Sequence, residues 1–533
     1  MKKLVSIMLI LVILFTLSGC GKAEEEKGVT MNVALGADIV RLDPAYAYDN
    51  ETSVVINQIT EPLLTHNPDN SLKNNLAESW EATDATTYVY KIRNDVNFSD
   101  GSPMTVKDVV FSLERHRDAK VASYMNWMFA NVESIKGTGE WEVTVKLKQP
   151  DATWKYVLAT SAGMIVKKSF CEEKGDQFGS STVGVIGTGP YMFEKWETGS
   201  KVILKRNPKY WDKSAKSNVD KVVFSIVADD TTLLTALKSG QIDFCATFSN
   251  TLNPSIEKID NVTLHSGSGM GIHYITFNTA KKPFDDINVR KAISYAIDLE
   301  SIHTNIIKAV GEIGKQLPMT DSLFTIEKDK WTEFAGSLEP HEYNLDKAKE
   351  YLAKSSVPNG FSCELLVKKT DAHRYDVALI LQEMLKKLNI EVTVVPVTGD
   401  EFFSYQFGNQ MVDGKRNYDM MVATWGADYP DPAGNLDPLY ASRSMGEGGS
   451  NSASYSNPKV DDLLAKANAS TDEKERADIL IEACKLIVED TPYYIYNYPK
   501  IFVISNSKYD FGDMNIYSTW DWNFKNANVQ VSK

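Results

Sequence analysis

The chain has 533 residues, enough for two to four domains at roughly 100–200 residues each. Apolar residues make up 43% of it and charged residues 24%, the balance of a globular protein with a sizeable core. The formal net charge of −14 argues against a nucleic-acid binder and against a protein held on anionic lipid by surface charge, because both need a basic face.

The first segment predicts export. Two lysines precede an apolar run over residues 4–17, which is too short to cross ~30 Å of hydrocarbon at ~1.5 Å per residue. The run ends in Leu17-Ser18-Gly19-Cys20, which resembles the bacterial lipobox, where cleavage precedes a cysteine that then carries diacylglycerol. We therefore predict a lipoprotein signal peptide over residues 1–19, a lipid on Cys20 and a solvated tether over 20–29. The alternative is an ordinary cleavage site with an incidental cysteine.

The mature chain reads as mixed α/β. Alternating apolar residues predict strands over residues 30–36, 87–93, 141–147, 202–204 and 222–227. Apolar residues at helical spacing predict helices that begin near Thr105 and at Asp286, and further helices over 374–389 and 470–489. Capping boxes are expected at Thr105/Asp108 and at Ser470/Glu473. No repeat of 20–50 residues occurs, which argues against solenoids and propellers.

Enzyme signatures are weak. The glycines of 184–189 look like a phosphate loop, but an extended stretch rather than a helix follows them, so a tight turn is the better interpretation. The serine within 267–271 is wrongly placed for a G-x-S-x-G nucleophile. We therefore predict a protein that is not an enzyme and that holds neither a metal nor a cofactor.

The cysteines give no metal or disulfide framework. The five cysteines include no C-x-x-C pair. Four remain in the mature chain, at positions 171, 245, 363 and 484. We expect separate buried thiols, with one disulfide as the open alternative.

Four stretches carry a family resemblance, in the same order as in the family. They are residues 76–80 leading to 98–109, residues 187–191 leading to 206–211, residues 277–293, and residues 425–432. Together they resemble the oligopeptide- and dipeptide-binding lipoproteins of bacterial ABC importers, the extracellular solute-binding proteins of family 5. The resemblance covers nearly all of the mature chain.

The resemblance implies an α/β, two-lobed fold like that of periplasmic binding proteins, with an extra inserted domain and a ligand cleft between the lobes. A discontinuous domain I is expected over residues 30–60, 185–279 and 496–533. Domain II is expected over 61–184 and domain III, the second lobe, over 280–495. The lobes are expected to close over the ligand by hinge bending.

The implied function is capture of oligopeptides outside the cytoplasm. The expected partners are a permease and its ATPase, with no nucleic acid, and the membrane is reached only through the lipid anchor. A monomer is expected. The same fold can also hold an oligosaccharide, a nickel chelate or haem, and a surface hydrolase or an adhesin is a further alternative from another class.

The fourth stretch supports a peptide ligand on chemical grounds. Every free peptide carries an ammonium group, and burying that charge requires a carboxylate. Asp428 stands where peptide-binding relatives place this carboxylate, and Trp425 matches an aromatic residue that lines the cleft. Gly426 and Ala427 are small enough for a close ligand backbone, and Tyr429 completes the expected contacts. The alternative is that Asp428 caps a turn and Trp425 belongs to the core.

Three further contacts are implied less directly. Tyr48 and Asn50 follow an early turn where relatives contact the ligand strand, although a solvated loop is an equal alternative. Tyr496 lies among alternating tyrosines that contact either the ligand or the other lobe. Val422 departs from relatives that carry an arginine there, so the partner of a ligand carboxylate is left open.

Overall fold

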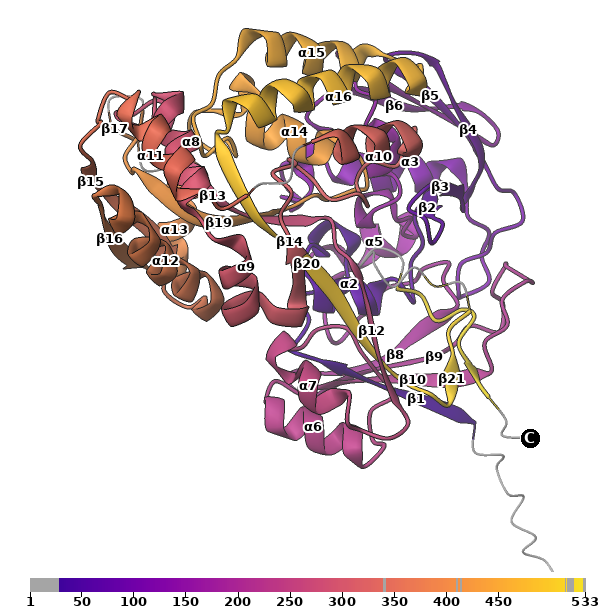
Figure 1. Cartoon of the computed structure of the whole chain (residues 1–533). Helices are drawn as coiled ribbons and strands as arrows, with labels where there is room; N and C mark the ends of the chain where they lie inside the picture. Colours follow the sequence, from indigo (N-terminus) through magenta and orange to yellow (C-terminus); the bar gives the residue numbers. More distant parts are fainter. Residues whose placement is uncertain are drawn as a thin grey trace, which may run out of the picture.

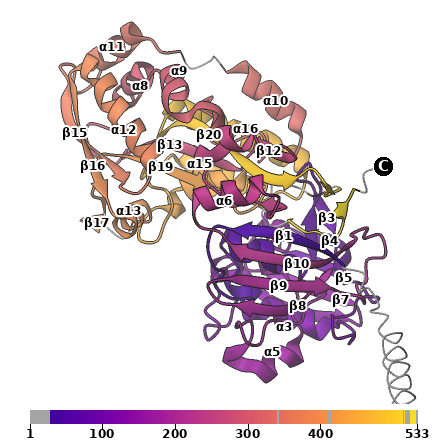
Figure 2. The same cartoon turned by 90° about the horizontal axis from the view of Figure 1, so that it is seen from below.

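The computed structural model describes residues 28–338, 342–408, 411–412, 415–512, 514 and 522–530. Cys20 and the signal segment lie outside these residues, so the lipid anchor stays a prediction. The described chain forms two lobes joined by the long strand β20 (Figure 1), and Figure 2 shows the second lobe at upper left and the first lobe at lower right. The predicted α/β, two-lobed fold is confirmed.

A twelve-stranded sheet runs through both lobes. Its order is β16 (Ile390–Val397), β15 (Phe361–Lys368), β19 (Met420–Gly426), β13 (Gly271–Phe277), β20 (Tyr493–Asn506), β11 (Phe244–Cys245), β1 (Val29–Leu35), β10 (Val219–Ile226), β9 (Lys201–Arg206) and β8 (Tyr191–Glu197). Two further strands, β12 (Val262–Ser268) and β14 (Gly311–Ile313), pair with β20. The first lobe adds a separate four-stranded sheet of β4 (Ala77–Asp84), β5 (Thr87–Ile92), β7 (Glu142–Leu147) and β6 (Val132–Gly139).

Three small two-stranded ribbons lie outside these sheets. They pair β2 (Leu64–His66) with β3 (Leu72–Asn74), β17 (Met411–Val412) with β18 (Lys415–Arg416), and β21 (Tyr509–Asp510) with β22 (Asn528–Val529). The helices of the first lobe are α2 (Asn50–Ile56), α3 (Val106–Arg115), α4 (Trp154–Val157), α5 (Lys168–Lys174), α6 (Asp230–Lys238) and α7 (Asn253–Ile256).

Helices cover both faces of the second-lobe half of the sheet. One core lies under α8 (Ile287–Ala296), α9 (Leu299–Ile302), α11 (Leu345–Ala353) and α12 (Ala372–Leu385). The other lies under α10 (Lys328–Ser337), α13 (Gly399–Gln406), α14 (Ala433–Tyr440), α15 (Pro458–Ala469) and α16 (Glu473–Asp490). The strands between them are apolar on both sides, as expected for a sheet buried on two faces.

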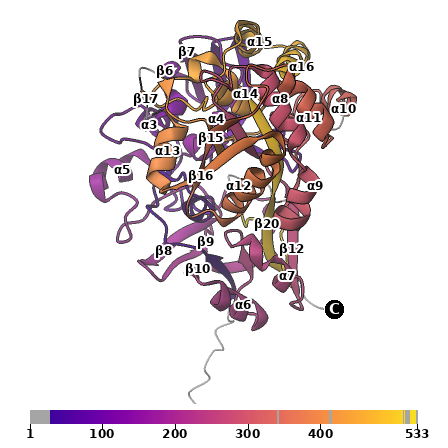
Figure 3. The ribbon, with the colours of Figure 1, turned by 60° about the vertical axis from the view of Figure 1, so that its left-hand side comes forward.

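Strand β20 connects the lobes. Its first half, Tyr493–Asn497, pairs with β13 in the second lobe, and residues 500–506 pair with β12 in the first. The chain also crosses between β12 and β13, where the backbone N–H of Gly269 donates to the carbonyl of Pro499 over 3.3 Å. Figure 3 shows β20 as one long strand that runs down beside α12 and α9 toward β12 and α7. The predicted boundaries of the three domains stay a prediction.

Most of the strands and helices predicted from the sequence occur in the structure. The strand patterns correspond to β1, β5, β7, β9 and β10, and the carboxylate of Asp108 caps α3 by accepting from the backbone N–H of Thr105 over 2.9 Å. The expected capping box at Ser470/Glu473 is wrong. Ser470 ends α15, and the carboxylate of Asp472 instead accepts from the first N–H groups of α16. A charged carboxylate directly before the helix suits this position better than a serine two residues earlier.

The glycine-rich stretch and the cysteines behave as expected. A Cβ atom on Gly187 would lie 2.0 Å from the carbonyl oxygen of Ile59, so this bend needs glycine for close backbone packing and not for phosphate. The four described cysteines are buried free thiols, and the alternative of a disulfide is wrong. Among the described helices, none combines the length and the apolar character that a membrane crossing requires.

Candidate functional site: a cavity between the lobes

A cavity of about 790 Å³ lies where the two lobes meet. The first lobe contributes Tyr48 and Trp127, and the second lobe contributes the remaining walls from α12, α13, the end of β19, α14 and the loop over 444–450. Four of the predicted site residues line it, namely Trp425, Gly426, Asp428 and Tyr429. Together with Tyr48, five of the eight predicted ligand contacts therefore share one cavity.

Asp428 lies just beyond the end of β19, half-buried in the cavity wall. The phenol of Tyr48 donates a hydrogen bond to its Oδ1 over 2.7 Å, which joins the two lobes at this point. Burial raises the pKa of the Asp428 carboxyl to about 6, and the hydrogen bond from Tyr48 opposes this shift. The same burial and the nearby carboxylate raise the pKa of Tyr48 as well. The cavity thus presents a carboxylate whose charge is costly to keep and is stabilised by a cationic ligand.

The neighbours of Asp428 shape the wall. Trp425 donates its indole N–H to the carbonyl of Gly434 over 2.9 Å, which fixes the ring. A Cβ atom on Gly426 would meet nothing within 4 Å, so this position is open to a ligand backbone. The ring of Tyr429 stacks on Tyr156 of the first lobe at 5.9 Å and 8°. These contacts hold the turn after β19 rigidly against both lobes.

The structure does not bring the other three predicted contacts to the cavity. Ala427 is buried, and its methyl group packs against Gly434 beneath the wall. Asn50 is exposed in the first turn of α2. Tyr496 is buried in the second-lobe core, with its ring 5.9 Å from His273. None of the three lines the cavity.

Asp431 has a different role from Asp428. Its carboxylate forms a fully buried ion pair with Arg476, with Oδ1 2.6 Å from Nη2 and Oδ2 2.7 Å from Nη1. It also accepts from the backbone N–H of Ala433 over 2.9 Å, which fixes the turn. The ion pair ties the turn to α16 and keeps this acid away from the cavity.

Neither Val422 nor the nearby Arg416 lines the cavity, so neither provides a partner for a ligand carboxylate there. Val422 is fully buried in β19. Arg416 is buried and donates to the carbonyls of Tyr405, Gln406 and Gly449. Its guanidinium is therefore committed to the second-lobe backbone.

Arg374 is the functional candidate that the sequence did not indicate. It lies in the first turn of α12 and lines the cavity. Its Nε donates to Oδ2 of Asp371 over 2.7 Å, which orients the guanidinium. Strands β15 and β19 run parallel, so Arg374 after β15 and Asp428 after β19 meet at one edge of the sheet. The parallel pairing of β15 and β19 identifies Arg374 as a candidate, and this pairing can be seen only once the strand order is known.

The charges of the cavity complement a zwitterion. Among the described residues, three charged ones line it, Arg374, Asp428 and Asp437. Asp437 is committed to the protein, since Arg443 lies 2.6 Å from its Oδ1 and Asn468 donates to its Oδ2 over 2.6 Å. Asp371 holds the Arg374 guanidinium in an ion pair and Tyr48 donates to Asp428, and these two groups place opposite charges in one cavity, as a ligand with both signs of charge requires.

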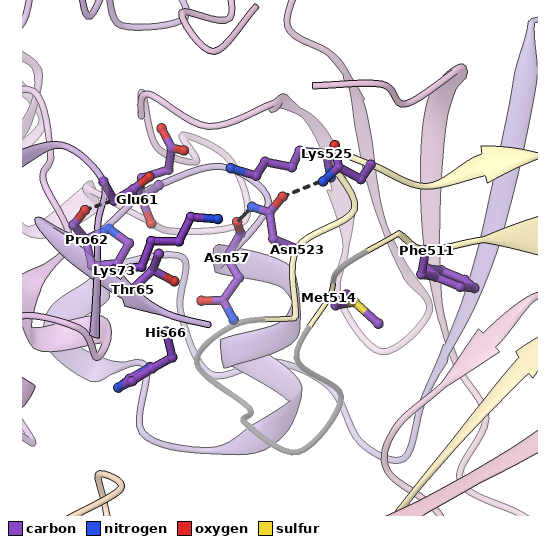
Figure 4. A pocket seen from close by; sticks show the side chains of 13 residues that line it. Asn57, Glu61, Pro62, Thr65, His66, Lys73, Phe511, Met514, Asn523 and Lys525 are labelled. Atoms are coloured by element: carbon purple, nitrogen blue, oxygen red, sulfur yellow. Dashed lines mark hydrogen bonds between the residues drawn. The ribbon is translucent and has the colours of Figure 1, made fainter. Parts of the chain in front are cut away.

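A second, polar pocket of about 80 Å³ lies in the first lobe beside the C-terminal segment (Figure 4). Its buried acid, Glu61, accepts from the hydroxyls of Thr188 and Tyr210 and from the indole of Trp211. Burial raises the pKa of Glu61, while Lys525 and these donors oppose the shift. Both of its oxygens are engaged within the protein, so this pocket is structural. No cluster of three metal-ligating side chains occurs among the described residues.

A known protein family matches most of the chain. The model of the bacterial extracellular solute-binding proteins, family 5, matches residues 71–447. The glutathione-binding protein GsiB of Escherichia coli K12 is 28% identical over 463 residues, which are 86% of this chain and 87% of that protein.

Solved structures of other proteins share the fold of this chain. DppA of Helicobacter pylori, an ABC transporter-associated periplasmic binding protein in complex with the peptide STSA, gives a TM-score of 0.74 at 26% identity, over 95% of this chain and 100% of that one. HbpA2 of Haemophilus parasuis gives a TM-score of 0.82 at 23% identity, over 94% and 100%, and so shares the fold. The predicted family resemblance is confirmed.

Proposed function

The chain belongs to the bacterial extracellular solute-binding proteins of family 5, and from this premise we propose that it captures short peptides with free termini for an ABC importer. The observation that carries the proposal is the pair of opposite charges, Asp428 and Arg374, in one cavity between two lobes. Asp428 binds the ammonium group of the ligand, and Arg374 binds its carboxylate.

The chemistry of peptides explains why such a pair suffices. The terminal ammonium and carboxylate are the same in every peptide, so two fixed charges bind peptides of different sequence. The cavity volume of about 790 Å³ lies within the range of roughly 300–1,000 Å³ for small-ligand sites. Glutathione and the peptide STSA, which relatives bind, each carry an ammonium group and a carboxylate.

An oligosaccharide is the second candidate ligand. The rings of Trp127 and Trp425 both line the cavity, and aromatic rings of this kind stack on sugars. However, a neutral sugar would bring no cation to the partly desolvated carboxylate of Asp428, whose charge is costly to keep there. The peptide is therefore the better match.

We place the protein outside the cytoplasm, as a monomer held at the membrane by a lipid on Cys20. From there it delivers its cargo to a permease with a cytoplasmic ATPase. The lipobox-like end of the signal segment supports the anchor. Cys20→Ala should abolish lipid labelling and release the protein from membranes, whereas unchanged labelling would contradict the anchor.

The ligand class is tested by thermal unfolding of the purified protein with separate pools of di- and tripeptides, oligosaccharides and nickel chelates. A ligand at about a hundred times its Kd stabilises the native state by about 2.7 kcal/mol, so the binding pool raises the unfolding temperature. We expect the peptide pool alone to do so. Stabilisation only by sugars or nickel chelates, or repeated turnover of chromogenic esters or glycosides, would contradict the proposal.

A further inference from the structure

Exposed aromatic rings gather at the cavity. Five aromatic side chains are exposed within the described part of the chain, and three of them, Tyr48, Trp127 and Phe403, line this one cavity. Trp127 is 49% exposed and Phe403 45% exposed. Large apolar surface left open to water at one place marks a binding site, because covering it is favourable.

The two rings come from opposite lobes and rest on well-packed supports. Trp127 belongs to the short 3-10 helix Asn126–Phe129, whose Met128 and Phe129 are buried in the first-lobe core. Phe403 belongs to α13 and follows Phe402, which is buried in the second-lobe core. Each ring is therefore held on a rigid element while its face is left uncovered.

Contacts behind Phe403 fix it further. The ammonium group of Lys368 lies 4.9 Å from the ring centre, and the ring of Phe407, which also lines the cavity, stacks at 6.1 Å and 29°. The charges that suit peptide termini, Asp428 and Arg374, belong to the same cavity. The aromatic walls are thus available to the apolar groups that the ligand carries between its charged termini, above all its side chains.

We propose that the cavity selects peptides that carry a bulky apolar side chain, leucine-like or aromatic, held against Trp127 and Phe403. This inference rests on the proposed peptide-binding function and adds a preference among peptides. A glycine, alanine or serine side chain is too small to cover two rings from different lobes, whereas a leucine or phenylalanine side chain removes apolar surface from water on both sides. The same contact would favour closure, because only the closed lobes present both rings.

The test measures Kd by calorimetry for Ala-Ala, Ala-Ser, Ala-Leu, Leu-Ala, Ala-Phe and Phe-Ala, and for the same peptides extended by one alanine. We expect the best apolar peptide to bind about ten- to a hundredfold more tightly than the alanine peptide of the same length. Trp127→Ala and Phe403→Ala should each bring this ratio close to one.

Tyr343→Ala is the matched control. Tyr343 is also exposed, at 37%, and Lys387 lies 5.4 Å over its ring as Lys368 lies over Phe403, but Tyr343 does not line the cavity. This variant should keep the full preference. Equal affinity of the native protein for alanine and apolar peptides, or an unchanged preference in both cavity variants, would overturn the inference while peptide binding stands. Binding of no peptide at all would overturn the proposed function and this inference with it.

Hydroxyl-radical footprinting of the native protein gives a readout that does not depend on folded variants. Saturating Ala-Leu or Ala-Phe should protect Trp127 and Phe403 from oxidation. Tyr124, which is 53% exposed and outside the cavity lining, should be oxidised equally with and without peptide. Unprotected Trp127 and Phe403 in a saturated complex would overturn the inference.

Discussion

Asp428 and Asp431 stand three residues apart and show how environment assigns different tasks to one side chain. Asp431 is fully buried against Arg476, which balances its charge within the protein. Asp428 faces the cavity, where the phenol of Tyr48 is a neutral donor and burial raises the pKa to about 6. The acid that lines the cavity is the one placed to meet a cationic ligand.

The raised pKa of Asp428 predicts pH-dependent binding. The ammonium group needs the ionised carboxylate, so peptide affinity should fall about tenfold per pH unit as the pH drops below about 6. Calorimetry from about pH 5 to pH 8 should show this fall, with proton release on binding near pH 6. Asp428→Asn should have a flat profile over the same range, and a flat profile in the native protein would contradict the assignment.

The raised pKa of Asp428 also changes the stability of the free protein with pH, in a direction that can be worked out. A carboxyl whose folded pKa lies above its unfolded value of 3.8 favours folding when it is protonated. Its contribution is present below about pH 4 and is lost as the pH rises through about 6. Bound peptide reverses this preference, because the ligand favours the ionised carboxylate.

Arg374 makes a separate prediction about the other terminus. A hydrogen bond to a charged group contributes about 1.5–3 kcal/mol, so Arg374→Gln should weaken binding of a free-acid peptide by about ten- to a hundredfold. The C-terminal amide of the same peptide should bind the native protein and the variant about equally. Equal binding of acid and amide by the native protein would contradict this role.

The sequence predicted part of this site, and the reason for the rest is physical. Asp428 and Trp425 lie in one short motif, where the chemistry of neighbouring residues is visible. Arg374, Trp127 and Phe403 reach the cavity only through strand order and the meeting of the lobes. Tyr496 lies in the second-lobe core, one of the two places left open for it, because a tyrosine on an alternating strand has the same pattern whether it faces a ligand or a core.

Helices and strands were predicted correctly from the local sequence where a single pattern dominated. The alternating strands and the cap at Asp108 came directly from periodicity and short-range hydrogen bonding. The start of α16 was misplaced because two helices lie close together and Ser470 ends the first of them. The parallel pairing of β15 and β19, which sets the geometry of the site, has no local signature.

The turn after β19 is held by one buried ion pair, and this makes a stability prediction. Asp431→Asn leaves the Arg476 guanidinium buried with its charge unbalanced, which typically costs about 3–5 kcal/mol. Denaturant unfolding should show this loss. The exposed pair of Asp462 and Lys466 is the matched control, and Asp462→Asn should cost less than about 1 kcal/mol. Equal small losses would mean that the buried pair does not hold the turn.

For the whole molecule, two segments cross between the lobes, β20 and the β12–β13 connection, and we expect one lobe to rotate against the other about them. The cavity is built mainly by the second lobe, with Tyr48 and Trp127 added by the first, so ligand contacts on both sides favour the closed arrangement. X-ray scattering should show a smaller radius of gyration when a peptide saturates the protein. An unchanged radius with a confirmed ligand would argue against closure.

We expect Asp428 to bind the terminal ammonium group of a peptide. A calorimetric cycle of four binding measurements tests this contact. Kd is measured for the native protein and Asp428→Asn, each with a free peptide and its N-acetylated form. Loss of a buried charge pair commonly costs about 2–5 kcal/mol, so either change alone should weaken binding by about thirtyfold to a few thousandfold. The two losses should not add, and the acetylated peptide should bind both proteins nearly equally. If the native protein binds free and acetylated peptides equally, Asp428 does not hold the ammonium group.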